Sequence, residues 1–205
     1  MFKIDYNPVL KRWEERKKVL PEETRKELED FSNRSVIKGE NLTVLKRVRK
    51  FELKDGDIFL CSLNGKVYYY GKILKAKIDN EQDPWISQGS MVCIFREKTT
   101  TKDLSNYKGD YSNPLGLFIV TRQYWTGGYF ETIGNIPLTE EDKNFDYGFY
   151  DKDFIGPMGG FYKETGEMLD YMPKYVYSFG ISTLIGVYNY LKEEAIIDPS
   201  LLTMD

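Results

Sequence analysis

The sequence has 205 residues, of which 41% are hydrophobic, 15% aromatic and 30% charged. This composition is typical of one folded domain with a sizeable core and argues against extensive disorder. The chain contains no histidine, which excludes a Ser-His-Asp triad, an imidazole acid or base, and a histidine-ligated metal site within it. Phosphate-binding loops of the G-x-G-x-x-G or Walker A type are also missing from the sequence, so we expect no cofactor and no metal.

Charge divides the chain into two parts. Residues 1–50 carry 14 basic and 9 acidic side chains, a net charge of +5, whereas residues 51–205 carry 15 and 23, a net charge of −8. Residues 1–50 are predicted to form a helical arm packed on the body. Residues 51–205 are predicted to form a β-rich domain that ends in a helix.

Helix signals lie at both ends of the sequence. Asn7-Pro8 predicts an N-cap followed by Pro at the first helical position. Pro21 ends this helix and opens a second one, whose first turn contains Glu22 and Glu23. A third helix is predicted over Ser182–Ala195 because one face of it is apolar.

Strand signals fill the middle of the chain. Asn64-Gly65 separates two β-rich runs, which predicts a hairpin with a two-residue type I′ turn, with Cys61 opposite Tyr68 and Leu60 opposite Tyr69. Both faces of this hairpin are apolar, so we expect both to be covered. Further strands are predicted at Met91–Phe95, Leu117–Thr121, Tyr129–Ile133, Gly159–Tyr162 and Tyr175–Phe179. The predicted class is α+β: a curled antiparallel sheet or partly open SH3-like barrel, flanked by N-terminal helices and a C-terminal helix.

Cellular location is inferred from the cysteines and the apolar runs. Cys61 and Cys93 lie in strand-like runs and are interpreted as small buried thiols in a reducing compartment. The N-terminal residues lack the apolar region of a signal peptide, and the longest apolar run, Leu115–Val120, is too short to span a bilayer. We therefore expect a cytoplasmic protein without a membrane partner.

Residues 140–154 combine a net charge of −4 with five aromatic side chains. Carboxylates beside aromatic anchors are typical of a surface that binds a basic protein. The alternative is a solvated loop whose aromatics turn inward to the core. A pair of carboxylates would also suit a glycosidase or another acid/base hydrolase, but nothing in the sequence fixes their separation. The candidate binding residues are Asp146, Tyr147, Phe149, Tyr150, Asp151 and Asp153.

The cluster Lys46–Lys50 contains four basic side chains. One interpretation is an SH3-like nucleic-acid-binding module that uses this cluster together with Tyr68–Tyr70. The other is a solvated segment that protects a sheet edge. The acidic body would repel a polyanion, which disfavours a nucleic-acid partner.

A longer pattern resembles a known family. Gly56-Asp57-Ile58-Phe59 and the aromatic run Leu63–Leu74 are followed by Phe118-Ile119-Val120 and by Phe130–Leu138, which contains Ile-Gly-Asn-Ile-Pro-Leu. These elements, in this order over residues 55–155, resemble the immunity protein 26 family of bacterial polymorphic toxin systems. The sequence departs from the family pattern at Cys61-Ser62, where Ile-Pro is expected, and at Phe130, where Trp is expected.

The resemblance implies a function in protein binding. It implies an immunity protein that binds and neutralises a cognate bacterial toxin and so protects the producing cell, with no catalysis and no cofactor. A toxin that acts on nucleic acid is often basic, and the acidic body would suit such a nuclease-type partner. The acidic and aromatic residues between Asp146 and Asp153 are then the predicted toxin-binding residues.

Overall fold

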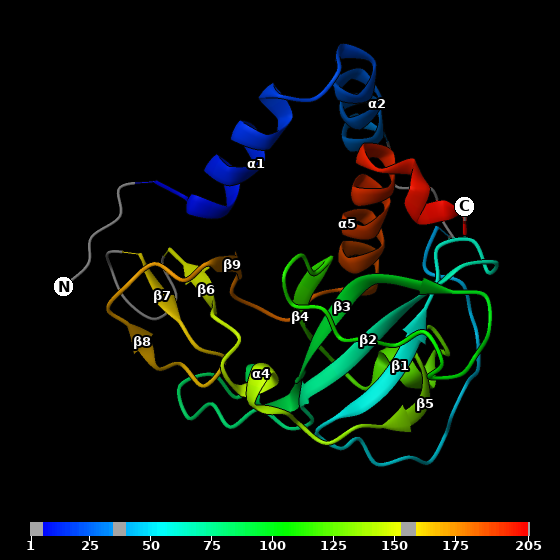
Figure 1. Cartoon of the computed structure of the whole chain (residues 1–205). Helices are drawn as coiled ribbons and strands as arrows, with labels where there is room; N and C mark the ends of the chain where they lie inside the picture. Colours follow the sequence, from blue (N-terminus) through cyan, green and yellow to red (C-terminus); the bar gives the residue numbers. More distant parts are fainter. Residues whose placement is uncertain (1–5, 35–39, 153–158, 205) are drawn as a thin grey trace.

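A computed structural model of the chain describes residues 6–34, 40–152 and 159–204. It shows an α+β protein with two sheets, two helices at the N-terminal side and a long helix near the C-terminus (Figure 1). The predicted α+β class and the flanking helices are confirmed. The sheets do not close into a barrel, and the second sheet was not expected from the sequence.

Helices dominate the two ends of the described chain, and strands dominate its middle. Along the chain the elements are α1 (Pro8–Lys18), α2 (Glu22–Asn33), β1 (Asp57–Cys61), β2 (Tyr68–Lys75), η1 (Ile86–Gln88), β3 (Ser90–Thr99), β4 (Gly116–Val120), α3 (Gln123–Thr126), β5 (Glu131–Asn135), α4 (Glu140–Lys143), β6 (Tyr147–Asp151), β7 (Gly160–Tyr162), β8 (Met168–Leu169), β9 (Tyr175–Ser178), α5 (Leu184–Ile197) and η2 (Pro199–Leu202).

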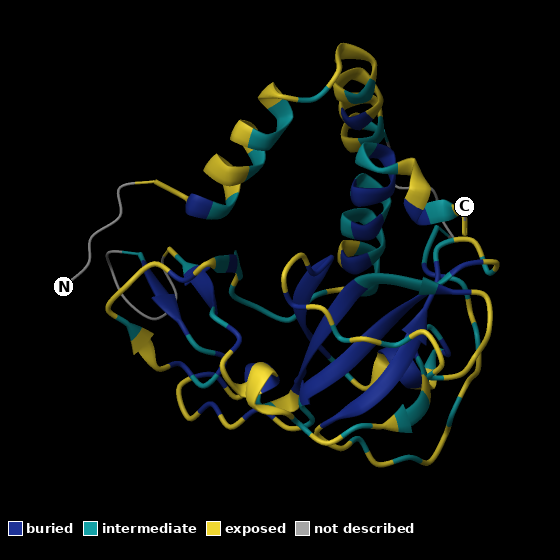
Figure 2. Ribbon diagram, in the orientation of Figure 1, coloured by how far each residue is buried: buried dark blue, intermediate teal, exposed yellow. Residues whose placement is uncertain are grey.

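The first sheet has the strand order β4-β3-β2-β1-β5, and all neighbouring strands are antiparallel. Both of its faces are buried, as Figure 2 shows by the dark strands at its centre. One face packs against α3 and α5 through Phe59, Tyr69, Val92, Trp125, Val187 and Leu191. The other faces the second sheet through Ile58, Tyr70, Cys93, Phe95, Phe145 and Phe149. The prediction that the hairpin is covered on both sides is therefore confirmed.

The predicted register of that hairpin is wrong by one residue. Leu60 lies opposite Tyr70, and Cys61 lies opposite Tyr69. The turn is longer than two residues because the Ser62 hydroxyl organises it, accepting from Gly65 N and donating to Val67 O over 2.5 Å. Only Gly65 in this turn has a positive φ, so a type I′ turn, which needs two such residues, is not formed.

The second sheet has the strand order β8-β7-β6-β9. Strand β9 runs parallel to β6, with Tyr147 opposite Tyr175 and Tyr150 opposite Ser178. This parallel pair departs from the expected purely antiparallel arrangement. A parallel neighbour needs a long crossover connection, and here β7, β8 and their loops supply it.

The predicted starts of the two N-terminal helices are confirmed. The Asn7 side chain accepts from Val9 N and Leu10 N, so it caps α1, and Pro21 precedes α2. Helix α2 packs against α5, whereas α1 lies across β9.

Among the described helices, none has the length and apolar character needed to cross a membrane. Cys61 and Cys93 are buried free thiols, as expected.

Candidate protein-binding site

The residues that carry the family pattern build the junction between β1 and β5. Gly56 adopts a φ of +84°, and a Cβ there would lie 2.4 Å from the carbonyl oxygen of Ile136. Asp57 pairs with Asn135, whose side-chain Nδ2 donates to Asp57 Oδ1 over 2.8 Å. Ile136 N also donates to Gly56 O over 2.9 Å. These signature residues therefore hold the sheet together, which is a structural role.

The aromatic part of the pattern has a packing role as well. A Cβ at Gly71 would lie 2.2 Å from Phe59 Cζ, so the missing side chain makes room for the phenyl ring. Phe59 in turn stacks on Phe130 with 4.3 Å between ring centroids. Phe130 stands where the family pattern has Trp, and it still closes this aromatic cluster against Trp125.

A buried ion pair ties β2 to α4. Lys72 Nζ lies 2.7 Å from Asp142 Oδ2, and the two side chains are 3% and 2% exposed. Asp142 also accepts from Tyr111 Oη at 2.5 Å and from Thr139 N at 2.6 Å. Burial alone would raise the pKa of Asp142, but these donors outweigh it and hold the pKa below its usual value. The carboxylate is therefore kept charged inside the protein.

The predicted binding segment forms β6 and the residues beside it. Tyr147, Phe149 and Tyr150 are buried, and the Tyr147 hydroxyl donates to Glu164 Oε2 over 2.6 Å. Asp146 and Asp151 are half-buried. Asp153 lies outside the described residues. The rings of the segment are thus buried, and its accessible side chains are the half-buried Asp146 and Asp151 and the exposed Lys152.

One exposed aromatic side chain, Tyr171, lies beside Asp146, and it comes from another part of the chain. Tyr171 is 45% exposed and donates from its hydroxyl to Asp146 Oδ1 over 3.1 Å. Met168 and Met172 are 52% and 47% exposed. Methionine and tyrosine side chains are adaptable contact residues at protein interfaces. Asp146 therefore lies beside one exposed aromatic side chain, Tyr171, and beside the main chain of Lys174.

The alternative nucleic-acid site retains only Tyr68 of its three tyrosines as a partly accessible ring, with Lys102 Nζ 5.6 Å from the ring centroid. Tyr69 and Tyr70 are buried, and their hydroxyls donate to Leu201 O and Asp103 O. Stacking on bases needs an accessible ring face. The segment that contains Lys46 is bonded to the main chain at Gly128, and its basic side chains are exposed to solvent.

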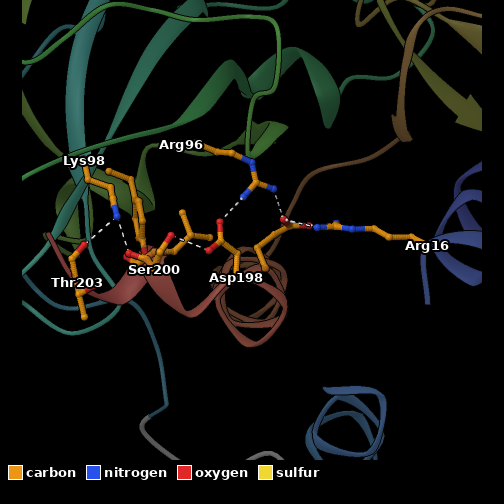
Figure 3. Close-up of polar contacts among 9 residues, drawn as sticks. Arg16, Arg96, Lys98, Asp198, Ser200 and Thr203 are labelled. Carbon is orange, nitrogen blue, oxygen red and sulfur yellow. Dashed lines mark hydrogen bonds and ion pairs between the residues drawn. The ribbon is translucent and has the colours of Figure 1, made fainter. Parts of the chain in front are cut away.

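A cleft of about 690 Å³ lies between α1, β9, α5 and the loop before β4. Arg16, Arg96 and Glu194 of its lining belong to a charged network (Figure 3). Glu194 on α5 is buried and binds Arg16 of α1 through both carboxylate oxygens. It also lies 2.5 Å from Arg96 of β3, which reaches Asp198 at 3.4 Å. This network fixes α1 to the body.

The same network shifts the titration of its neighbours. The Glu194 carboxylate raises the pKa of the Arg16 guanidinium by hydrogen bonding to it. Burial raises the pKa of Glu193, and the neighbouring charge of Glu194 adds to the effect.

The sequence did not predict this charged network. Its one local signal is Glu194 itself, a charge on the apolar stripe three residues after Leu191.

The described residues contain no group of three or more Cys, Asp or Glu side chains arranged to hold a metal ion. The geometry thus defines an α+β protein with a two-sheet frame, a half-buried carboxylate at Asp146 beside the exposed Tyr171, and a cleft beneath α1.

The comparison with known families concerns the segment that forms the first sheet. The model of the family described as Immunity protein 26 matches residues 54–154, and this match supports the family resemblance found in the sequence. Neither the search of curated proteins nor the search of solved structures found a match.

Proposed function

We propose that this protein is an immunity protein that binds and neutralises a bacterial toxin inside the cell that produces it. The observation that carries the proposal is the family match over residues 54–154. Immunity proteins typically have no enzymatic activity, and the family implies a toxin as partner. We propose further that the protein acts in the cytoplasm, that it works by sequestration without catalysis, and that its toxin belongs to a polymorphic toxin system.

The charge of the body supports a basic partner of the nuclease type. Residues 51–205 carry a net charge of −8, and such a surface would accelerate the approach of a basic toxin domain. Within this proposal Asp146 and Asp151 lie in the interface with the toxin. The neighbouring exposed side chains of Met168, Tyr171 and Met172 supply apolar contact area.

The first test needs the gene next to the one for this protein. The C-terminal domain of a large secreted polypeptide encoded there is expressed in a bacterial host with and without this protein. We expect growth arrest by the toxin domain alone, normal growth on co-expression, and a complex that co-elutes in gel filtration. Growth arrest that persists on co-expression, with no complex formed, would reject the proposed function.

The second test concerns the acidic surface. Asp146→Asn removes the charge and keeps one acceptor oxygen, so that it can retain one of the two hydrogen bonds that Asp146 accepts from the Tyr171 hydroxyl and from Lys174 N. Together with Asp151→Asn it should slow association with the toxin several-fold at low salt, and the difference should shrink at high salt. Glu29→Lys, on the exposed side of α2, is the control. Unchanged association rates at low salt would place the interface elsewhere.

A further inference from the structure

Strand β9 is an edge strand with one free side. It pairs with β6 through Tyr175 N, which donates to Asp146 O over 3.1 Å, and the ladder continues to Phe179 N on Tyr150 O at 3.0 Å. Since peptide groups alternate in direction along a strand, those of Val176 and Ser178 point to the opposite side. The described part of the chain forms no hydrogen bond with them there.

This free edge lies in the wall of the cleft beneath α1. The cleft is lined by all four residues of β9 and, opposite them, by Leu10 and Trp13 of α1 and Tyr190 of α5. Leu10 is 55% exposed although it faces this space. The volume of the cleft, about 690 Å³, is in the range of sites that enclose a ligand. An extended chain laid along β9 would find hydrogen bonds on one side and apolar contacts on the other.

Cations without carboxylate partners surround the same edge. Arg12 of α1 donates to Lys174 O over 3.0 Å, and neither Arg12 nor Lys174 forms an ion pair within the described chain. Lys174 Nζ lies over the Tyr175 ring instead, at 4.9 Å from its centroid. The Nε–H of Arg96, which lines the cleft, is buried and lacks a partner among the described residues. Glu193 and Glu194 also line the cleft, but Glu194 is paired with Arg16 and Arg96. Arg12 and Lys174 at the β9 edge therefore remain available to a carboxylate group of an occupant.

We propose that the cleft binds an extended segment of the partner protein, with at least one acidic side chain, as an additional strand on the free edge of β9. The inference rests on the proposed function in that the segment would belong to the toxin. It concerns one segment only, so the remaining toxin surface is free to be basic and to contact the acidic side at Asp146. Main-chain pairing would give affinity, and Arg12 and Lys174 would select the acidic side chain.

The experiment uses the full chain and two synthetic probes, an eight-residue peptide of alternating Val and Glu and its Val and Lys counterpart. Binding is measured by fluorescence anisotropy. The first variant is Ser178→Pro, which removes one outward N–H at an exposed edge position, where proline is tolerated. Its control is Ser178→Ala, which keeps the N–H. The second variant is Arg12→Glu, with Arg25→Glu on the exposed face of α2 as its control.

We expect the Val and Glu peptide to bind the wild-type chain and the Val and Lys peptide to bind at least about tenfold more weakly, because the cations repel it. Ser178→Pro and Arg12→Glu should each raise Kd for the Val and Glu peptide about fivefold or more, as loss of one hydrogen bond or charge contact predicts. The two controls should leave Kd unchanged. Amide exchange at Val176 and Ser178 should slow when the peptide is added.

The proposal is overturned if the acidic peptide does not bind, if both peptides bind equally, or if Ser178→Pro and Ser178→Ala behave alike. These outcomes are separate from the growth test, because the peptide assay contains no toxin. Growth arrest on co-expression combined with cleft-specific peptide binding would reject the toxin function and retain the strand-binding site. Protection by a Ser178→Pro/Arg12→Glu double variant equal to that by wild type would reject a toxin as the occupant.

Discussion

The ion pair between Lys72 and Asp142 makes the sharpest prediction about stability. Lys72 is in β2, in the middle of the first sheet, and Asp142 is in α4, where it also completes the capping box with Thr139. Both side chains are almost inaccessible, at 3% and 2% exposure. Lys72→Met keeps the length of the apolar stem and removes the ammonium group. The Asp142 carboxylate would then remain buried with its hydrogen bonds from Tyr111 and Thr139 alone.

The expected cost follows from this burial. Removing one partner of a buried ion pair costs about 3–5 kcal/mol, because the other charge stays in a poorly solvated place. The hydrogen bonds that remain on Asp142 place Lys72→Met at the lower end, about 3 kcal/mol. The double variant Lys72→Met/Asp142→Asn should lose less than the sum of the two single changes, since no uncompensated charge is left.

The assay is urea denaturation followed by tryptophan fluorescence. Lys66→Met in the exposed turn is the control and should change the free energy of unfolding by less than about 0.5 kcal/mol. The pKa of Asp142 is lowered in the folded chain. Its contribution is therefore present above the unfolded pKa, about 3.9, and is lost as the pH falls through the lower folded pKa. A loss below about 1 kcal/mol for Lys72→Met at pH 7 would refute the argument from burial.

Two further predictions concern packing and titration. Gly71→Ala should lower the free energy of unfolding by about 1–3 kcal/mol, because the new methyl group would overlap the Phe59 ring; a change within error in urea denaturation would mean that the ring moves aside. Glu193→Gln should raise Tm at pH 7. The pKa of Glu193 is raised by burial and by Glu194, so folding disfavours its charged form. The gain should vanish below the unfolded pKa, about 4.3, and a constant gain at all pH values would contradict this cause.

The strands and long helices could be predicted from local patterns, but the hairpin register could not. Alternation cannot choose between two registers when both faces are apolar, since each register buries apolar side chains. The choice depends on Ser62, whose hydroxyl bonds to three backbone groups of the turn. A shift of one residue changes which side chains share a face of the sheet. In the structure Tyr69 packs with Phe59 on the side of α5, whereas Tyr70 packs on the side of the second sheet.

The second sheet and the cleft depend on contacts that local sequence does not encode. Strand β6 looks like an acidic and aromatic surface segment because aspartates flank its aromatics, yet packing against the first sheet buries Tyr147 and Phe149. The Arg16–Glu194 pair joins residues 178 positions apart. Glu194 on an apolar stripe does predict a buried partner, but no spacing in the sequence identifies which arginine supplies it.

The limits of the family match bear on how the partner would be chosen. The matched segment, residues 54–154, contains the first sheet, α4 and β6. Helix α1, strand β9 and helix α5, which form most of the cleft, lie outside it. Within the proposed function, the matched segment then supplies the rigid frame and Asp146, whereas the flanking segments supply the free strand edge and Arg12. A chain with the same frame and different flanking segments would present a different cleft, so exchange of α1 and β9 should transfer partner choice without disturbing the signature contacts at Gly56 and Asn135.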